Sequence, residues 1–235
     1  MILINRVWNK NDFVDFRKYL FTIANKDYKE FTSKLTPGES KFIGISIPVL
    51  KSIAKDIAKG DYKSFLLIEC LYHEEKMIKG LVISYIKDFD LYLNYMYQFV
   101  KEVDNWAICD CVVQSSKLYK KNLEKGWVFV NYCLSSNEEY IIRVGIVLML
   151  TYYINDNYIE DVLEKAAEVK FEAYYVKMAV AWLISVAFVK YSHKVIPMLK
   201  KDFDKFTNNK AISKIRDSFR VSKDLKEYIT KYRIK

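Results

Sequence analysis

Helix-breaking residues are scarce along this chain, which has only 6 glycines and 3 prolines among 235 residues. A β-sandwich or β-barrel needs many tight turns, and those turns rely on Gly and Pro. Apolar residues recur with the period of a helix, and no segment sustains the alternation of a half-buried strand. The sequence therefore predicts an all-α protein of about a dozen helices joined by short connections.

Residues that favour helix capping mark where these helices begin. Asn11 and Asp12 predict a first helix that ends near Ile23. Ser46 and Pro48 predict another that ends near Ala58. A loop is expected at Pro37 and Gly38, and further helix starts are expected near Asp61, Glu74, Asp88, Asp104, Ser136, Asp156, Ser192, Thr207 and Ser222.

The hydrophobic fraction of 51% argues against disorder, and the length suits one large domain or two small ones, of which one domain covering residues 1–235 is expected. A net charge of +9 favours an anionic partner such as nucleic acid or a membrane surface, although an ordinary charged surface accounts for it equally well. The N-terminus lacks the apolar core of a secretory signal, and the long apolar run at 171–190 contains Lys177. A soluble cytoplasmic protein is expected.

Four cysteines are present, but they form no CxxC pair, and the two histidines are far apart in sequence. No metal site is therefore expected. The cysteines lie in apolar runs, which predicts small, reduced core residues.

Three apolar segments begin alike, with one basic residue followed by a small residue one or two positions on. They are KGLVISYI from Lys79, RVGIVLML from Arg143 and KMAVAWLI from Lys177. Arg143 and Lys177 are 34 residues apart, and Lys79 and Arg143 are 64 apart, about twice that distance. A repeat of this length built from helix pairs predicts an α-solenoid, with the segment around Asp110 filling the gap.

Equivalent positions of a solenoid line one curved surface, so Lys79, Asp110, Arg143 and Lys177 are expected in a row. A groove with three cations fits a nucleic-acid backbone. Alternatively, the three cations mark helix ends and reach into water. The pattern alone favours neither.

Trp106 and Asp110 are four residues apart in VDNWAICD, so they share one face of a helix that Asp104 or Asn105 can cap. A carboxylate is expensive to bury in such an apolar run. Asp110 could pair with Arg143 and tie two repeats together, which is the structural alternative to a catalytic role. Trp182, between Ala181 and Leu183, is expected to be packed core and does not share the face of Lys177.

Several segments, in this order and spacing, resemble the DNA alkylation repair family of AlkD-like DNA glycosylases. The resemblance covers nearly the whole chain and is carried by KFIGISIPVLKSIAK (41–55), EEKMIKGLVISYI (74–86), VDNWAICD (103–110), YIIRVGIVLML (140–150), YYVKMAVAW (174–182) and NKAISKIRDSFRVSK (209–223).

This resemblance implies a superhelix of HEAT-like repeats that cradles duplex DNA on its concave face. It also implies excision of N3- and N7-alkylated purines by a single chain, without deep base flipping, metal or cofactor. The family's W-x-x-x-D pair maps to Trp106 and Asp110, its second Trp to Trp182 and its Arg to Arg143. Combined with the row of repeat positions, this predicts Asp110, Trp106 and Trp182 as catalytic residues and Arg143, Lys177 and Lys79 as DNA-binding residues.

One segment departs from the family pattern. LTPGESKF (35–42) has no Tyr or Trp where the best-known branch has an aromatic-containing helix. Two other functions fit the same fold and charge, a non-catalytic nucleic-acid-binding module and a protein-interaction scaffold. Residues 205–235, with ten Lys or Arg against three Asp or Glu, either extend the DNA-binding surface or form a solvated cap.

Overall fold

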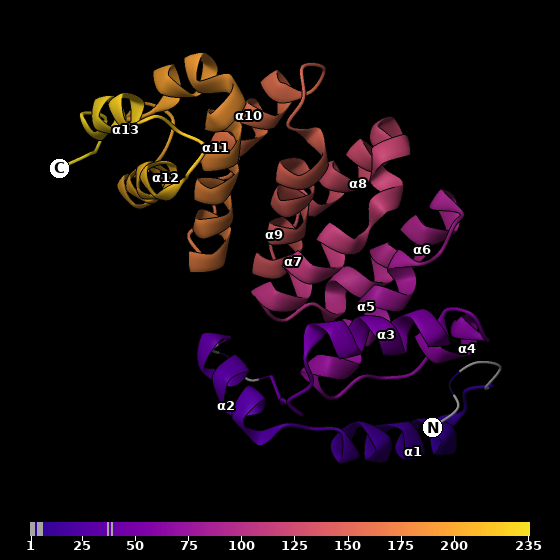
Figure 1. Cartoon of the computed structure of the whole chain (residues 1–235). Coiled ribbons are helices and arrows are strands. Elements are labelled where there is room, and N and C mark those ends of the chain that lie inside the picture. The colour runs from indigo at the N-terminus through magenta and orange to yellow at the C-terminus, as the bar shows by residue number, and fades with distance from the viewer. Residues whose placement is uncertain (1–2, 4–6, 37, 39) are drawn as a thin grey trace. The chain divides into compact units, whose positions relative to one another are not determined.

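The computed structural model describes residues 3, 7–36, 38 and 40–235 of the chain. This part contains α-helices α1 to α13 and no β-strand, which confirms the all-α prediction (Figure 1). It forms two compact units, Met1–Leu118 (unit 1) and Tyr119–Lys235 (unit 2), and each is described by itself. A single domain over 1–235 stays a prediction.

Unit 1 is built around α5 (His73–Ser84), which contacts α3, α4, α6 and α7. Ten of the 12 residues of α5 are buried, as expected for a helix covered on all sides. The other elements of unit 1 are α1 (Lys10–Thr22), α2 (Lys26–Leu35), α3 (Ile47–Ile57), α4 (Tyr62–Leu66), α6 (Phe89–Phe99), the 3-10 turn η1 (Val100–Glu102) and α7 (Trp106–Ser115).

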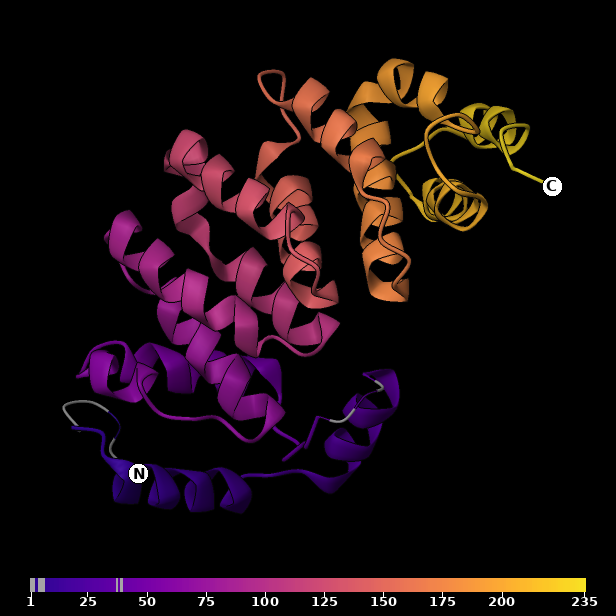
Figure 2. The ribbon, with the colours of Figure 1, turned by 180° about the vertical axis from the view of Figure 1, so that it is seen from behind.

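Unit 2 is built around α11 (Tyr174–Val195), a helix of 22 residues that contacts α9, α10 and α12. In both ribbon views α13 lies beside α12 (Figures 1 and 2). The remaining elements are α8 (Leu123–Leu134), α9 (Glu139–Leu148), the π-turn η3 (Met149–Tyr153), α10 (Ile159–Glu168), the 3-10 turn η4 (Ile196–Met198), α12 (Lys205–Asp217) and α13 (Lys223–Thr230). The 3-10 turn η2 (Lys117–Lys121) spans the boundary between the units.

By length and composition alone, Tyr174–Met198 could cross a membrane, with a mean hydropathy of 1.3. Of its most apolar window, 56% is buried inside the fold. Central helices of soluble proteins have the same property, and α11 is packed against three neighbouring helices. Its apolar character is therefore explained by its position in the core of unit 2.

Several predicted helix boundaries are confirmed. Ser46, Asp61, Asp88 and Ser222 are the N-cap residues of α3, α4, α6 and α13. The first helix begins earlier than predicted, because Asn9 caps it through the N–H groups of Asn11 and Asp12.

Other boundaries differ from the prediction. The start predicted near Ser192 falls at a kink within α11, where Tyr191 has non-helical backbone angles (φ −122°, ψ 41°) and a second helical segment follows it. α12 begins before Thr207 because Asp204 accepts hydrogen bonds from the first turn. In the loop predicted at 37–38, Gly38 has a φ of 143°, and Pro37 lies outside the described residues.

The small residues of the repeat lie where helices approach each other closely. A Cβ on Gly80 would come within 2.4 Å of Cγ2 of Val112, so a larger residue there would force α5 and α7 to shift. A Cβ on Gly145 would meet Cβ of Cys133 in α8 at 3.0 Å. The repeated sequence thus marks helix-to-helix contacts within each unit, whereas the superhelical arrangement of the whole chain stays a prediction.

Candidate functional site

Helix α7 has a buried and a partly exposed face. Ile108, Cys109, Val112 and Val113 are buried, whereas Trp106, Ala107, Asp110 and Cys111 are half-buried and Gln114 is exposed. The shared face that the four-residue spacing predicts for Trp106 and Asp110 is therefore present. The carboxylate is not enclosed in the core, so it does not carry the full cost of burial.

The buried side chain of Asn105 caps the start of α7. Its Oδ1 accepts a hydrogen bond from the N–H of Ile108 at 3.0 Å, and its Nδ2 lies 3.1 Å from Nδ1 of His73. Because the amide nitrogen is a donor, this Nδ1 must be the acceptor, which assigns the ring proton to Nε2. Burial lowers the pKa of His73 and so favours this neutral form. Trp106 is the next residue, so this cap fixes the position of its backbone.

The indole of Trp106 is also held through its side chain. Its Nε1–H donates to the carbonyl oxygen of Leu35, the last residue of α2, at 3.1 Å. Because this bond occupies the indole donor, the ring offers only its π-face and apolar edges to another molecule.

A second buried polar contact joins two of the segments that carry the family resemblance. Glu74, 1% exposed, accepts hydrogen bonds from the N–H groups of Ile43 at 2.8 Å and Gly44 at 2.7 Å. Gly44 has a φ of 105°, and a Cβ there would lie 2.4 Å from the carbonyl oxygen of Asn25. The loop before α3 is thus fixed to the start of α5 by a conformation that requires glycine.

Sequence reasoning identified Glu74 and Glu75 only as a helix start. Glu75 is also fully buried, and it binds Nε of Arg17 at 2.5 Å and Nη2 at 3.1 Å. Two adjacent acidic residues before an apolar run are expected at any helix N-terminus, whether or not they are buried. The sequence therefore gives no sign that Glu74 and Glu75 have buried hydrogen-bond partners.

Lys79 uses its charge inside unit 1. The ammonium lies 2.6 Å from a carboxylate oxygen of Glu102 and 3.2 Å from the carbonyl oxygen of Ile68, and the residue is 7% exposed. Neither a phosphate ligand nor a cation reaching into water fits this environment well. The prediction that Lys79 binds DNA stays untested, and these contacts argue against it.

Lys177 has a similar arrangement in unit 2. It pairs with Glu172, and its ammonium lies 3.6 Å from a carboxylate oxygen of Asp204, the N-cap of α12. The hydrogen bond with Glu172 is the largest of the effects that raise the pKa of Lys177. The cations at these two repeat positions therefore connect successive helical segments.

Arg143 is 5% exposed and reaches the first turn of α11. Its Nη1 donates to the carbonyl oxygen of Tyr175 at 2.7 Å, and its guanidinium carbon lies 6.0 Å from the centroid of that ring. The N–H of Tyr175 in turn donates to Glu139 at 2.8 Å. Sequence reasoning missed Tyr175, whose role depends on a contact between α9 and α11.

Trp182 is half-buried, so the prediction that it is packed core is wrong. It lies on a partly exposed stripe of α11, while Ala181 and Leu183 beside it are buried. Spacings of three and four residues along the helix place Tyr175, Met178, Trp182, Val186 and Val189 on this stripe.

The predicted site residues thus fall into two sets. Unit 1 contains Lys79, Trp106 and Asp110, and unit 2 contains Arg143, Lys177 and Trp182. A single row through all the repeat positions stays a prediction.

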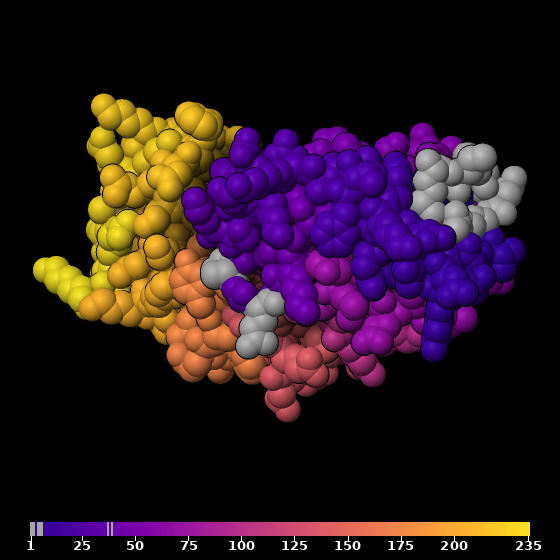
Figure 3. All heavy atoms as spheres, turned by 90° about the horizontal axis from the view of Figure 1, so that it is seen from below, coloured from indigo at the N-terminus to yellow at the C-terminus, as the bar shows by residue number. Residues whose placement is uncertain are grey.

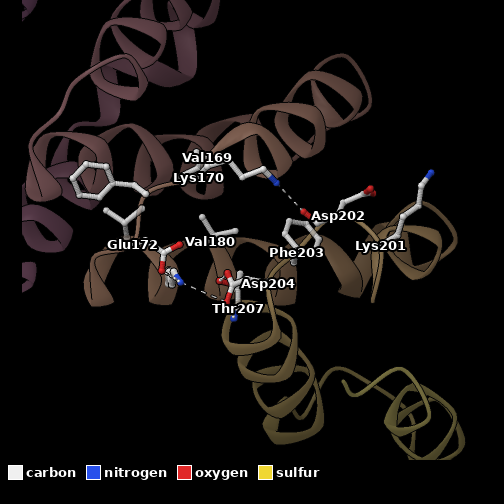
Figure 4. A pocket seen from close by; sticks show the side chains of 12 residues that line it. Val169, Lys170, Glu172, Val180, Lys201, Asp202, Phe203, Asp204 and Thr207 are labelled. Carbon is white, nitrogen blue, oxygen red and sulfur yellow. Dashed lines mark hydrogen bonds and ion pairs between the residues drawn. The ribbon is translucent and has the colours of Figure 1, made fainter. Parts of the chain in front are cut away.

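A cavity of about 280 Å³ in unit 2 contains Lys177 but neither Arg143 nor Trp182 (Figure 4). Val176, Val180 and Phe203 contribute its apolar walls. Lys170 at its rim donates to the carbonyl oxygen of Asp202 at 3.2 Å. Within the described ranges, no group of three or more His, Cys, Asp or Glu side chains could hold a metal ion.

The chain was also compared with known protein families. A family model for DNA alkylation repair enzymes matches residues 16–214. The chain belongs to this family. Its members' role in repairing alkylated DNA makes the protein a repair enzyme with DNA as its partner. The match includes Trp106, Asp110, Arg143 and Trp182 and ends inside α12. No curated protein matches the chain.

Proposed function

We propose that the protein is a monofunctional, AlkD-like DNA glycosylase that excises N3- and N7-alkylated purines from duplex DNA. Alkylation at these positions gives the base a positive charge and weakens its bond to the sugar. As the base departs, positive charge develops on the deoxyribose, as in other glycoside cleavages that pass through an oxocarbenium-like state.

The observation that carries this proposal is the partly exposed face of α7, where Trp106 and Asp110 lie one helical turn apart. A carboxylate beside the sugar stabilises its developing charge and can orient the attacking water. Asp110 fits this role because an ionised carboxylate accepts hydrogen bonds and donates none. Water is the second substrate, so the reaction calls for no cofactor.

Trp106 and Trp182 are proposed to attract the cationic nucleotide through their ring faces, by roughly 0.5–2 kcal/mol each. Both rings are half-buried, and the indole N–H of Trp106 is already bonded to Leu35. These features favour stacking or cation–π contact over a hydrogen bond from that indole. Contact through the ring faces suits a mechanism without deep base flipping.

Arg143 is proposed to bind a backbone phosphate near the lesion, because a guanidinium carries five N–H donors and the contact with the carbonyl oxygen of Tyr175 uses one of its nitrogens, Nη1. Lys79 and Lys177 receive no such role, since their ammonium groups are paired within the protein. We further propose that the protein acts as a monomer and is located in the cytoplasm.

The test is incubation of the purified protein with methylated duplex DNA, followed by chromatography of the released bases. Release of 7-methylguanine is expected, together with abasic sites that break only after alkali treatment. Unmethylated duplex is the control and should release nothing. Binding to methylated duplex without any base release would contradict the proposal and favour a non-catalytic DNA-binding module.

A further inference from the structure

The C-terminal part of unit 2 carries positive charge that the fold does not neutralise. Residues 205–235 contain ten Lys or Arg and three Asp or Glu. Among the described residues, none of these ten cations forms an ion pair. Elsewhere in the same unit, Lys165, Lys190 and Lys194 are each paired with a carboxylate. The contrast shows that ion pairs are available in this unit and are missing at its C-terminal end.

These cations line two adjoining hollows along α12. One is open, with a volume of about 700 Å³, and its lining includes Lys205 and Lys210 together with Glu172 and Asp204, the two carboxylates that pair with Lys177. The other has a volume of about 410 Å³, and its charged lining residues are Arg216, Lys223, Lys226 and Arg233 against Asp217 and Glu227, an excess of cations. Ser213 and Arg233 line both hollows, so they form one depression, here called the α12 groove. Gold and yellow atoms of this end of the chain stand at the surface in Figure 3.

The C-terminal segment is fastened to α12 rather than loosely attached. Asn209 donates to the carbonyl oxygen of Ile234 at 2.8 Å and accepts from its N–H at 2.9 Å. Nη2 of Arg233 donates to Oγ of Ser213 at 2.8 Å. The guanidinium is thereby held at the junction of the two hollows, with its position set by the fold.

Lys214 follows the groove residue Ser213 on α12 but lines neither hollow. It is half-buried on α12. Burial is the largest effect that lowers its pKa, and the charges of Arg143 and Lys210 lower it further, while the carboxylate of Asp217 acts in the opposite direction. A cation that is crowded by other cations is stabilised when an anion binds beside them. This favours a polyanion along α12 over simple hydration of scattered lysines.

We propose that the α12 groove binds the phosphodiester backbone of DNA beyond the nucleotide that is being repaired. The inference rests on the proposed function for its substrate. A helix of 13 residues is about 20 Å long, enough for several phosphates of one strand. Arg216, Lys223, Lys226 and Arg233 lie outside the family match at 16–214, so the groove extends the part of the chain shared with the family.

The experiment compares two triple variants that remove the same amount of charge from unit 2. The groove variant carries Lys210→Gln, Arg216→Gln and Lys226→Gln. The control carries Lys165→Gln, Lys190→Gln and Lys194→Gln, all at cations with internal partners. Thermal unfolding followed by circular dichroism selects variants that keep the wild-type fold.

Affinity for an undamaged, fluorescein-labelled duplex is then measured by anisotropy between 50 and 200 mM salt, a range in which the neutralisation of about three phosphates is readily resolved. The plot of log K against log salt should become shallower by about 0.9 for each phosphate that the variant no longer neutralises, so by about 2 to 3 for the groove variant. The control should keep the wild-type slope. Equal slopes for the two variants would overturn the proposal.

Two further readouts separate this proposal from its alternatives. Single-turnover release of 7-methylguanine at saturating protein should be the same for the groove variant and the wild type. A shallower slope with no base release by the wild type would remove the glycosylase proposal and leave the groove as a DNA-binding surface. Binding to phosphatidylserine vesicles that the groove variant loses, with its DNA slope unchanged, would assign the groove to membranes and overturn the proposal.

Discussion

Nδ1 of His73 lies 3.1 Å from Nδ2 of Asn105, and Asn105 caps the helix that carries Trp106 and Asp110. One buried amide thus joins the start of α5 to the start of α7. The orientation of the proposed catalytic pair depends on this contact, although neither His73 nor Asn105 is proposed to touch the substrate.

Asn105→Ala should lower the free energy of unfolding by about 2–4 kcal/mol, because it removes a helix cap and leaves a buried ring nitrogen without its donor. Urea denaturation measures the change. Asn25→Ala is the matched control, since Asn25 caps α2 through the N–H of Tyr28 in an exposed setting. This variant should be destabilised by about 1 kcal/mol. Equal effects at the two caps would show that the His73 contact adds nothing.

The stability of the protein should fall as the pH drops below neutrality. Burial depresses the pKa of His73 in the folded state, so the unfolded chain binds the extra proton more readily. The stability that neutral His73 contributes is therefore complete above the pKa of the unfolded state, about 6.5, and is lost as the pH falls through the pKa of the folded state. Glu74, Asp104 and Lys76 also influence this ring.

Urea unfolding of the wild type and His73→Gln between pH 5 and 7.5 tests this dependence, with a slope of at most about 1.4 kcal/mol per pH unit from one group. The variant should show the weaker pH dependence. His193→Gln is the control, since His193 is exposed, and it should follow the wild type. Parallel curves for the wild type and His73→Gln would contradict the assignment.

Gly80→Ala should destabilise the protein by about 1–3 kcal/mol, because the added Cβ overlaps Val112 and Phe99 and forces α5 away from α7. Gly145→Ala should cost less, since its closest contact is 3.0 Å rather than 2.4 Å. Thermal unfolding of both variants gives the comparison. A larger destabilisation by Gly145→Ala than by Gly80→Ala would show that the close packing of α5 on α7 does not limit the size of the side chain at position 80.

The sequence predicts local features of this site well. Trp106 and Asp110 share a face because helical spacing alone determines it, and Asn105 is a capping residue wherever a helix follows it. Gly80 and Gly145 lie at close helix contacts, and the small residue that recurs in the repeat is the sequence signal for both.

Features that depend on distant segments could not be predicted in this way. Lys79 pairs with Glu102, 23 residues away, and nothing in the repeat distinguishes that partner from a phosphate. α2 buries none of its own residues, and its start depends on the N–H of Asn25 bonding to the carbonyl of Gly44.

The central claim is that the Asp110 carboxylate stabilises the sugar as the base departs. The most direct test is the single-turnover rate of 7-methylguanine release from methylated duplex, at saturating protein, for the wild type and for Asp110→Asn, which keeps the shape and removes the charge. The account predicts a decrease of about 100-fold or more in this rate, with affinity for undamaged duplex retained. Equal rates for the two proteins would contradict it.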